Sequence, residues 1–101
     1  LNVKIKTNIY PSEELTIVAD VKGGINPNER LVFSAHVQEP GANDNATGVG
    51  VALEMASLTA KFIQKQQYQP KRTLTFLWGD EIVSTKRYVK EDSIRAKNIK
   101  W

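Results

Sequence analysis

Two short apolar runs, residues 31–35 and 73–78, place the strongest constraint on how this chain can fold. The first does not alternate with polar residues, which is typical of a strand buried on both faces, and the second is of the same kind. Between the two runs, apolar residues recur at helical spacing from Val49 to Ile63. The order strand, helix, strand predicts a βαβ unit, whose crossover is right-handed in nearly all cases.

The sequence ahead of this unit predicts a hairpin. Apolar and polar side chains alternate along residues 3–9, as expected of a half-buried strand. Residues 10–14 supply a turn, and residues 15–21 predict a second strand that returns beside the first. Toward the C-terminus, residues 86–92 predict a short helix and residues 98–101 the start of another strand. The expected fold class is therefore α/β, a partial mixed sheet with an N-terminal antiparallel hairpin and a βαβ unit.

Composition excludes several kinds of partner. The 101 residues fit one domain, and their net charge of +3 comes from 14 basic and 11 acidic residues that are scattered along the chain. Without a basic run we expect no nucleic-acid partner. No apolar stretch approaches the ~18 residues that a membrane crossing needs, so we expect no membrane partner either.

Side chains with metal-binding chemistry follow both predicted parallel strands. His36 stands at the end of the first strand, Asp44 lies in the loop after it, and Asp80 and Glu81 follow the second strand. Because neighbouring parallel strands place their carboxyl ends on one edge of the sheet, ligand sites form there. The chain has no cysteine, and one imidazole with three carboxylates suits zinc or a similar divalent ion.

Each of these residues also has a purely structural interpretation. A single histidine at a strand end more often makes a hydrogen bond or lies on the surface than binds a metal. Asp44 precedes a predicted helix and can cap it, as can Asn45 or Thr47. Asp80 and Glu81 can form an ordinary solvated turn. Spacing alone leaves both interpretations open, and the metal interpretation depends on the convergence of these features on one edge.

Two segments resemble the signature of the cocatalytic zinc aminopeptidases, which include bacterial leucyl aminopeptidases and glutamate carboxypeptidase II. Residues 34–36 (SAH) are followed by residues 40–49 (PGANDNATGV) and by an apolar helix that contains Glu54. Downstream, residues 70–73 (PKRT) lead into an apolar strand that ends in paired acids, similar to the family's next block. The resemblance implies a three-layer zinc-exopeptidase domain, of which residues 1–101 form an incomplete, N-terminal portion.

The resemblance also implies a role for each candidate residue. His36 matches the ligand of one zinc, Asp44 the carboxylate that bridges two zinc ions, and Glu81 the acidic ligand of the other zinc. Asp80 stands where the family has its general base, usually a glutamate, which takes a proton from the metal-bound water. The implied activity is two-zinc-dependent hydrolysis of the peptide bond beside a free amino terminus, with a peptide as substrate. The resemblance slightly favours a secreted or periplasmic location.

Three departures from the family pattern bear on activity. The family commonly has an aspartate two residues after the histidine, and the neutral amide of Gln38 at this position should orient the imidazole more weakly, a change typically worth about 10–100-fold in affinity or rate. Asp80 is one methylene shorter than the usual glutamate. The family's remaining ligands, an aspartate and a second histidine, are expected beyond Trp101, since His36 is the one histidine of the chain. We therefore expect the fragment alone to be inactive.

The leading interpretation is a fragment of a zinc-dependent exopeptidase, in the first place an aminopeptidase, with carboxypeptidase and cyclase left open. The alternative is a non-catalytic relative that uses the same fold for protein–protein interaction. Gln38 and Asp80 favour this alternative, whereas the intact set of His36, Asp44 and Glu81 favours catalysis. A truncated sheet would present an unpaired apolar edge, so we also expect self-association.

Overall fold

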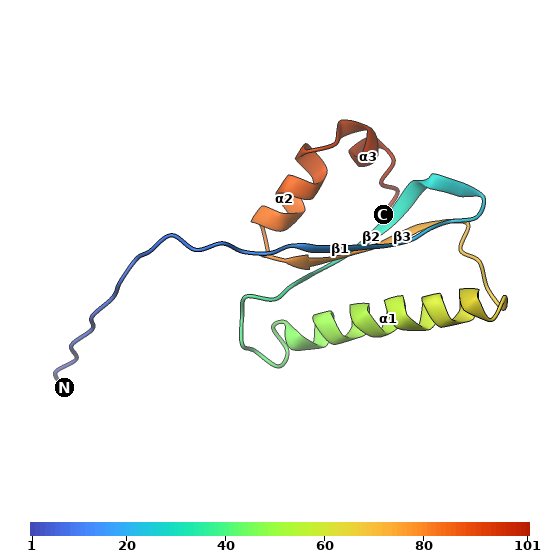
Figure 1. Cartoon of the computed structure of the whole chain (residues 1–101). Coiled ribbons are helices and arrows are strands. Elements are labelled where there is room, and N and C mark those ends of the chain that lie inside the picture. The colour runs from blue at the N-terminus through green and yellow to red at the C-terminus, as the bar shows by residue number, and fades with distance from the viewer.

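Three strands form a small sheet with helices on both of its faces in the computed structural model, which describes residues 1–101 (Figure 1). In chain order the elements are β1 (Ile17–Val21), β2 (Asn26–His36), α1 (Ala46–Gln64), β3 (Arg72–Gly79), α2 (Val83–Lys90) and α3 (Ser93–Lys97). Helix α1 lies below the sheet in Figure 1, and α2 and α3 lie above it. The α/β fold class with a partial mixed sheet is confirmed.

Strand β3 lies at the centre of the sheet, in the order β1-β3-β2. It runs parallel to β2 and antiparallel to β1, so β2, α1 and β3 form the predicted βαβ unit. The register pairs Phe33 with Phe76 and His36 with Gly79. This register brings His36 to the same sheet edge as the residues that follow β3.

The predicted N-terminal hairpin does not form. Residues 1–16 adopt no helix or strand, and Figure 1 shows this segment extending away from the sheet. Val3 and Ile5 are 70% and 79% exposed. Alternation marks side chains that fit one face of a sheet, but a strand also needs a partner for its backbone and a surface to pack on. Strand β1 finds both on β3 and not on residues 3–9.

The core lies between the sheet and α1. Phe76 and Trp78 of β3 point to this side and are buried, together with Ala35 of β2 and Ala52 of α1. The ring of Phe76 stacks on those of Phe33 and Trp78, with centroids 5.4 and 5.9 Å apart. Small alanines on the helix and strand let the backbone of α1 approach these large rings, which is how one helix covers the centre of the sheet.

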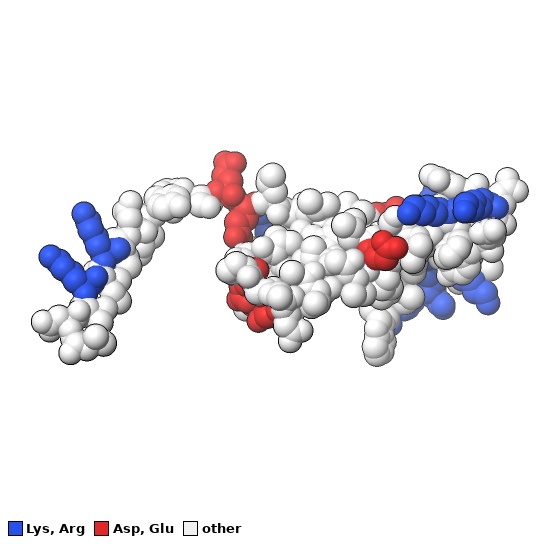
Figure 2. All heavy atoms as spheres, turned by 90° about the horizontal axis from the view of Figure 1, so that it is seen from below, with Lys and Arg blue, Asp and Glu red and all other residues white.

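The opposite face of α1 is apolar and exposed. By length and composition, the 19-residue helix α1 is the one helix apolar enough to cross a membrane. This finding corrects the expectation that no apolar stretch approaches the ~18 residues that a membrane crossing needs. The expectation considered uninterrupted apolar runs, whereas α1 has small and hydroxyl residues between its apolar ones and only Glu54 and Lys61 as charges. Figure 2, which views this side of the molecule, shows a surface that is mostly uncharged but is interrupted by acidic side chains. Its exposed side chains include Val51, Leu53 and Phe62.

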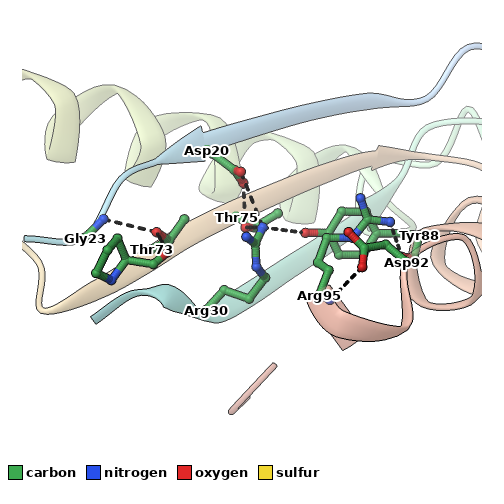
Figure 3. Close-up of polar contacts among 9 residues, drawn as sticks. Asp20, Gly23, Arg30, Thr73, Thr75, Tyr88, Asp92 and Arg95 are labelled. Carbon is green, nitrogen blue, oxygen red and sulfur yellow. Dashed lines mark hydrogen bonds and ion pairs between the residues drawn. The ribbon is translucent and has the colours of Figure 1, made fainter. Parts of the chain in front are cut away.

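Arg30 organises the other face of the sheet (Figure 3). Its Nη1 donates to Tyr88 Oη at 3.0 Å and to Thr75 Oγ1 at 3.3 Å, and lies 3.3 Å from Asp20 Oδ2. Thr75 in turn donates to Asp20 Oδ1 at 2.6 Å. Burial opposes the charge of Arg30, but the hydrogen bond to Tyr88 and the nearby Asp20 outweigh it and raise the pKa of Arg30. These contacts join all three strands to α2.

The C-terminal residues begin a further strand beside β2, as predicted. Ile99 forms an isolated parallel bridge with Arg30, and Val32 N donates to Trp101 O at 2.7 Å. Residues 86–92, expected to be helical, fall largely within α2, which starts three residues earlier at Val83. Because this extra pairing lies on the outer side of β2, the free edge of the sheet is that of β1.

Candidate metal centre

A tight loop between β2 and α1 returns Asp44 to the end of β2. Within this loop Ala46 N donates to Gly41 O at 3.1 Å and Thr47 N donates to Ala42 O at 3.0 Å. The peptide bond between Asp44 and Asn45 is cis. In this loop the side chains of His36 and Asp44, eight positions apart in the sequence, face each other.

The contact between His36 and Asp44 has the spacing of two ligands of one ion. His36 Nε2 lies 2.9 Å from Asp44 Oδ1, yet this buried nitrogen has no partner with hydrogen-bond geometry. Two atoms that each lie ~2.0–2.1 Å from a tetrahedral zinc are separated by about 3.3 Å. The two atoms therefore lie at about the right separation around a common point, and the pair fits a zinc ion.

Glu39 joins this pair, although the sequence analysis did not select it. Its Oε2 lies 3.6 Å from His36 Nε2, and one ligand atom from each of His36, Glu39 and Asp44 lies within 4.8 Å of the other two. Glu39 stands three residues after His36 in the connecting loop. A carboxylate so close to a strand-end histidine is the signal that would have identified it.

The second ring nitrogen of His36 contacts Asn45. His36 Nδ1 lies 3.3 Å from Asn45 Nδ2. Asn45 occupies the N-cap position of α1, but its side chain makes no capping hydrogen bond. A Cβ atom at Gly48 would lie 2.1 Å from Asn45 Oδ1, so a side chain at this position would displace the Asn45 amide. Neither Asp44 nor Asn45 therefore caps α1 through its side chain.

Asp80 and Glu81 lie apart from this group. Asp80 Oδ1 accepts hydrogen bonds from the backbone N–H of Ile82 at 3.1 Å and of Val83 at 2.7 Å, at the start of α2. Asp80 Oδ2 makes no hydrogen bond. Glu81 is exposed, and its carboxylate is not a member of the His36 group. The structure brings His36 and Asp44 together, and leaves Asp80 and Glu81 on the neighbouring turn.

The sheet edge that carries these residues is acidic. No lysine or arginine occurs between Arg30 and Lys61, or between Arg72 and Lys86. In Figure 2, carboxylates gather at the end of the body that adjoins the N-terminal segment, and basic side chains gather at the opposite end. A negative potential at this edge favours a cation over an anion.

Comparison with known proteins identifies the family of this chain. Residues 16–82 match the model of peptidase family M28. This match covers more than half of the chain, and the chain therefore belongs to peptidase family M28. The resemblance to zinc aminopeptidases seen in the sequence motifs is confirmed.

Curated relatives carry related names. A probable zinc metalloprotease of Pyrenophora tritici-repentis is 34% identical over 80 residues, which cover 67% of this chain and 17% of the relative. An aminopeptidase of Pseudomonas aeruginosa is 35% identical over 80 residues, covering 75% of this chain and 13% of the relative. Aminopeptidase NAALADL1 of Rattus norvegicus is 25% identical over 85 residues, covering 77% of this chain and 11% of the relative. No solved structure matches significantly. The chain spans less than a fifth of the length of these relatives.

Proposed function

We propose that this chain supplies part of the two-zinc site of an aminopeptidase, with His36, Asp44 and Glu81 as metal ligands. The observation that carries the proposal is the 2.9 Å separation of His36 Nε2 and Asp44 Oδ1 without hydrogen-bond geometry. Membership of peptidase family M28 and relatives named zinc metalloprotease and aminopeptidase support the same activity. The substrate is a peptide with a free amino terminus; nucleic acid and membrane are not partners in this proposal.

The chain's own residues have distinct tasks in this mechanism. A zinc ion held by these residues would supply a Lewis acid for the scissile carbonyl and the attacking water. Asp44 and His36 hold their donor atoms toward one point, and Asn45 fixes the imidazole ring. Asp80 accepts the proton of the attacking water: Oδ1 is held by the start of α2, which leaves Oδ2 free and fixed in direction.

The proposed site needs more ligands than these residues provide. His36 is the single histidine of the chain, and Glu81 lies outside the group formed by His36 and Asp44. Two zinc ions held ~3.5–4 Å apart require more donor atoms on both ions. We therefore propose that the 101 residues by themselves hydrolyse no peptide.

Zinc titration and peptide hydrolysis test this function on two proteins: the 101-residue chain and a version extended by about 150 residues, roughly one further domain's worth. Calorimetry should show two zinc ions in the extended protein, and that protein should release the amino-terminal residue of a peptide but not of its N-acetylated form. Asp44→Asn should remove this activity. Glu13→Gln also replaces a carboxylate with an amide, but in the exposed N-terminal segment, and should not remove it. An extended protein that binds no metal would establish the non-catalytic alternative.

A further inference from the structure

We propose that Glu39 is a third protein ligand to the zinc of His36 and Asp44, so that the 101-residue chain binds one zinc ion on its own. This inference rests on the proposed function, which places zinc on His36 and Asp44. It adds Glu39 as a second ligand in the loop after β2, where the motif resemblance assigned Asp44 alone.

The separations of the donor atoms fit one tetrahedral ion. His36 Nε2 lies 2.9 Å from Asp44 Oδ1 and 3.6 Å from Glu39 Oε2. These two distances lie on either side of the ~3.3 Å expected between ligands that are each ~2.0–2.1 Å from a tetrahedral zinc. Small side-chain rotations would equalise them. Three protein ligands with a fourth, open position are also the arrangement of catalytic zinc sites.

The two carboxylates have no other polar partner. Glu39 and Asp44 are 46% and 75% exposed in their side chains, and the one contact of each is with His36. Two carboxylates within 4.8 Å of each other repel, and neither forms an ion pair with a lysine or arginine. A divalent cation between them would remove this repulsion, since it attracts both.

The histidine is held in place to complete the set. Its side chain is 15% exposed, and the contact of Nδ1 with Asn45 restrains rotation of the ring. Support of the second ring nitrogen is a general feature of histidines that bind metals. A turn of the Asn45 amide would present Oδ1 to an Nδ1–H, which leaves the buried Nε2, without a hydrogen-bond partner, as the donor atom for zinc.

Calorimetric titration of the 101-residue chain with zinc tests the role of Glu39. The unmodified chain should bind one ion, and Glu39→Gln should weaken binding at least ~100-fold, beyond the usual effect of a residue that only supports a ligand. Glu39→His, which restores a donor atom, should recover most of the affinity. Glu13→Gln is the matched control and should bind as the unmodified chain does. Circular dichroism of each variant checks that it is folded.

Cobalt(II) absorption provides a second measurement, because its visible bands report the number and geometry of ligands. Glu39→Gln should change the spectrum of the cobalt-loaded chain, and Glu13→Gln should leave it unaltered. If zinc binding is lost in His36→Ala and Asp44→Asn but unchanged in Glu39→Gln, the role of Glu39 is overturned while the proposed function stands. If the 101-residue chain binds no zinc but the extended protein binds two zinc ions, the role of Glu39 is likewise overturned and the proposed function stands. Absence of zinc from both proteins would overturn the inference and the proposed function together.

Discussion

Asn45 shows how a single residue is used for the site rather than for the helix it begins. An asparagine at an N-cap position usually accepts a hydrogen bond from the first turn, but here the side-chain amide lies against His36. It contacts the ring nitrogen that the family's aspartate would support, where this chain has Gln38. When Nε2 binds a metal, Nδ1 carries the proton, and a turn of the amide would present Oδ1 as its acceptor.

Removal of this amide should weaken zinc binding without destabilising the chain. We expect Asn45→Ala to lower zinc affinity by about 10–100-fold, as for other residues that support a metal ligand. The free energy of unfolding should hardly change, since no capping hydrogen bond is lost. Calorimetry and urea unfolding measure the two quantities. Asn43→Ala, in the same loop, is the control, and an equal loss of affinity in both variants would refute the specific role of Asn45.

Asp80 has a structural task that can be separated from its proposed chemical one. Asp80→Ala removes the acceptor for Ile82 and Val83 N–H and should lower the free energy of unfolding by about 1 kcal/mol. Asp80→Asn keeps an acceptor oxygen, so it should cost less stability. In the extended protein both variants should lose hydrolysis, since neither can take a proton. Full activity in Asp80→Asn would exclude Asp80 as the general base.

At the scale of elements, α1 combines support for the sheet with support for the metal centre. Gly48 lies in its first turn, where alanine is the better helix former by about 0.5–1 kcal/mol. The same glycine leaves room for Asn45, whose Oδ1 would meet an added Cβ atom at 2.1 Å.

Gly48→Ala should therefore change stability and metal affinity in opposite directions. The chain should become more stable to urea, and zinc affinity should fall because Asn45 must leave His36. Gly50→Ala is the matched control, since nothing lies within 4 Å of a Cβ atom there. It should raise stability without altering affinity. An unchanged zinc affinity in Gly48→Ala would show that the contact between Asn45 and His36 is dispensable.

Arg30, in β2, connects this strand to β1, β3 and α2. Arg30→Met should lower the free energy of unfolding by about 2 kcal/mol, within the ~1.5–3 kcal/mol found for hydrogen bonds to charged groups. The loss is moderate because Asp20 is 46% exposed and stays hydrated. Arg30→Lys keeps the charge but not the planar donor set, so its free energy of unfolding should lie between those of the unmodified chain and Arg30→Met. Urea unfolding of the three proteins measures this order, and equal stability would contradict it.

The charge on Arg30 also predicts how the network responds to pH. The pKa of Arg30 is raised in the folded chain, so its stabilising contribution is complete below the ordinary arginine value and is lost only above the raised one. Arg30 therefore stays charged throughout the range in which the protein is handled. The destabilisation caused by Arg30→Met should accordingly not depend on the ionisation of Arg30 between neutral and mildly alkaline pH.

The whole molecule exposes more apolar surface than its sheet can cover. Its extents are 62 × 30 × 20 Å, with the N-terminal segment projecting from the body in Figure 1. The outer face of α1 is apolar, and β1 is an edge strand, paired only with β3, whose Ile17 and Val18 are 61% and 47% exposed. Such edges pair readily with strands of other chains.

We propose that the 101-residue chain self-associates through the β1 edge. Sedimentation velocity should show a mass that rises with protein concentration, and Val18→Lys, a charge on the edge strand, should shift the population toward monomer. Ile9→Lys introduces the same charge in the N-terminal segment and should have a smaller effect. A monomer at all concentrations would refute self-association, and an equal effect of both substitutions would assign it to general apolar surface.

The sequence alone determined the βαβ unit and the edge at which His36 and Asp44 would meet. Both follow from local patterns: apolar runs and helical spacing define the elements, and strand ends define where their polar neighbours emerge. The tertiary structure decided that β1 pairs with β3, that Glu39 joins the histidine, and that Asn45 leaves the helix for the site. Arg30 likewise lies 45 and 58 positions from Thr75 and Tyr88. These contacts depend on which residues, distant in the sequence, offer a backbone partner, burial or an opposite charge. Local sequence patterns contain no information about such long-range contacts.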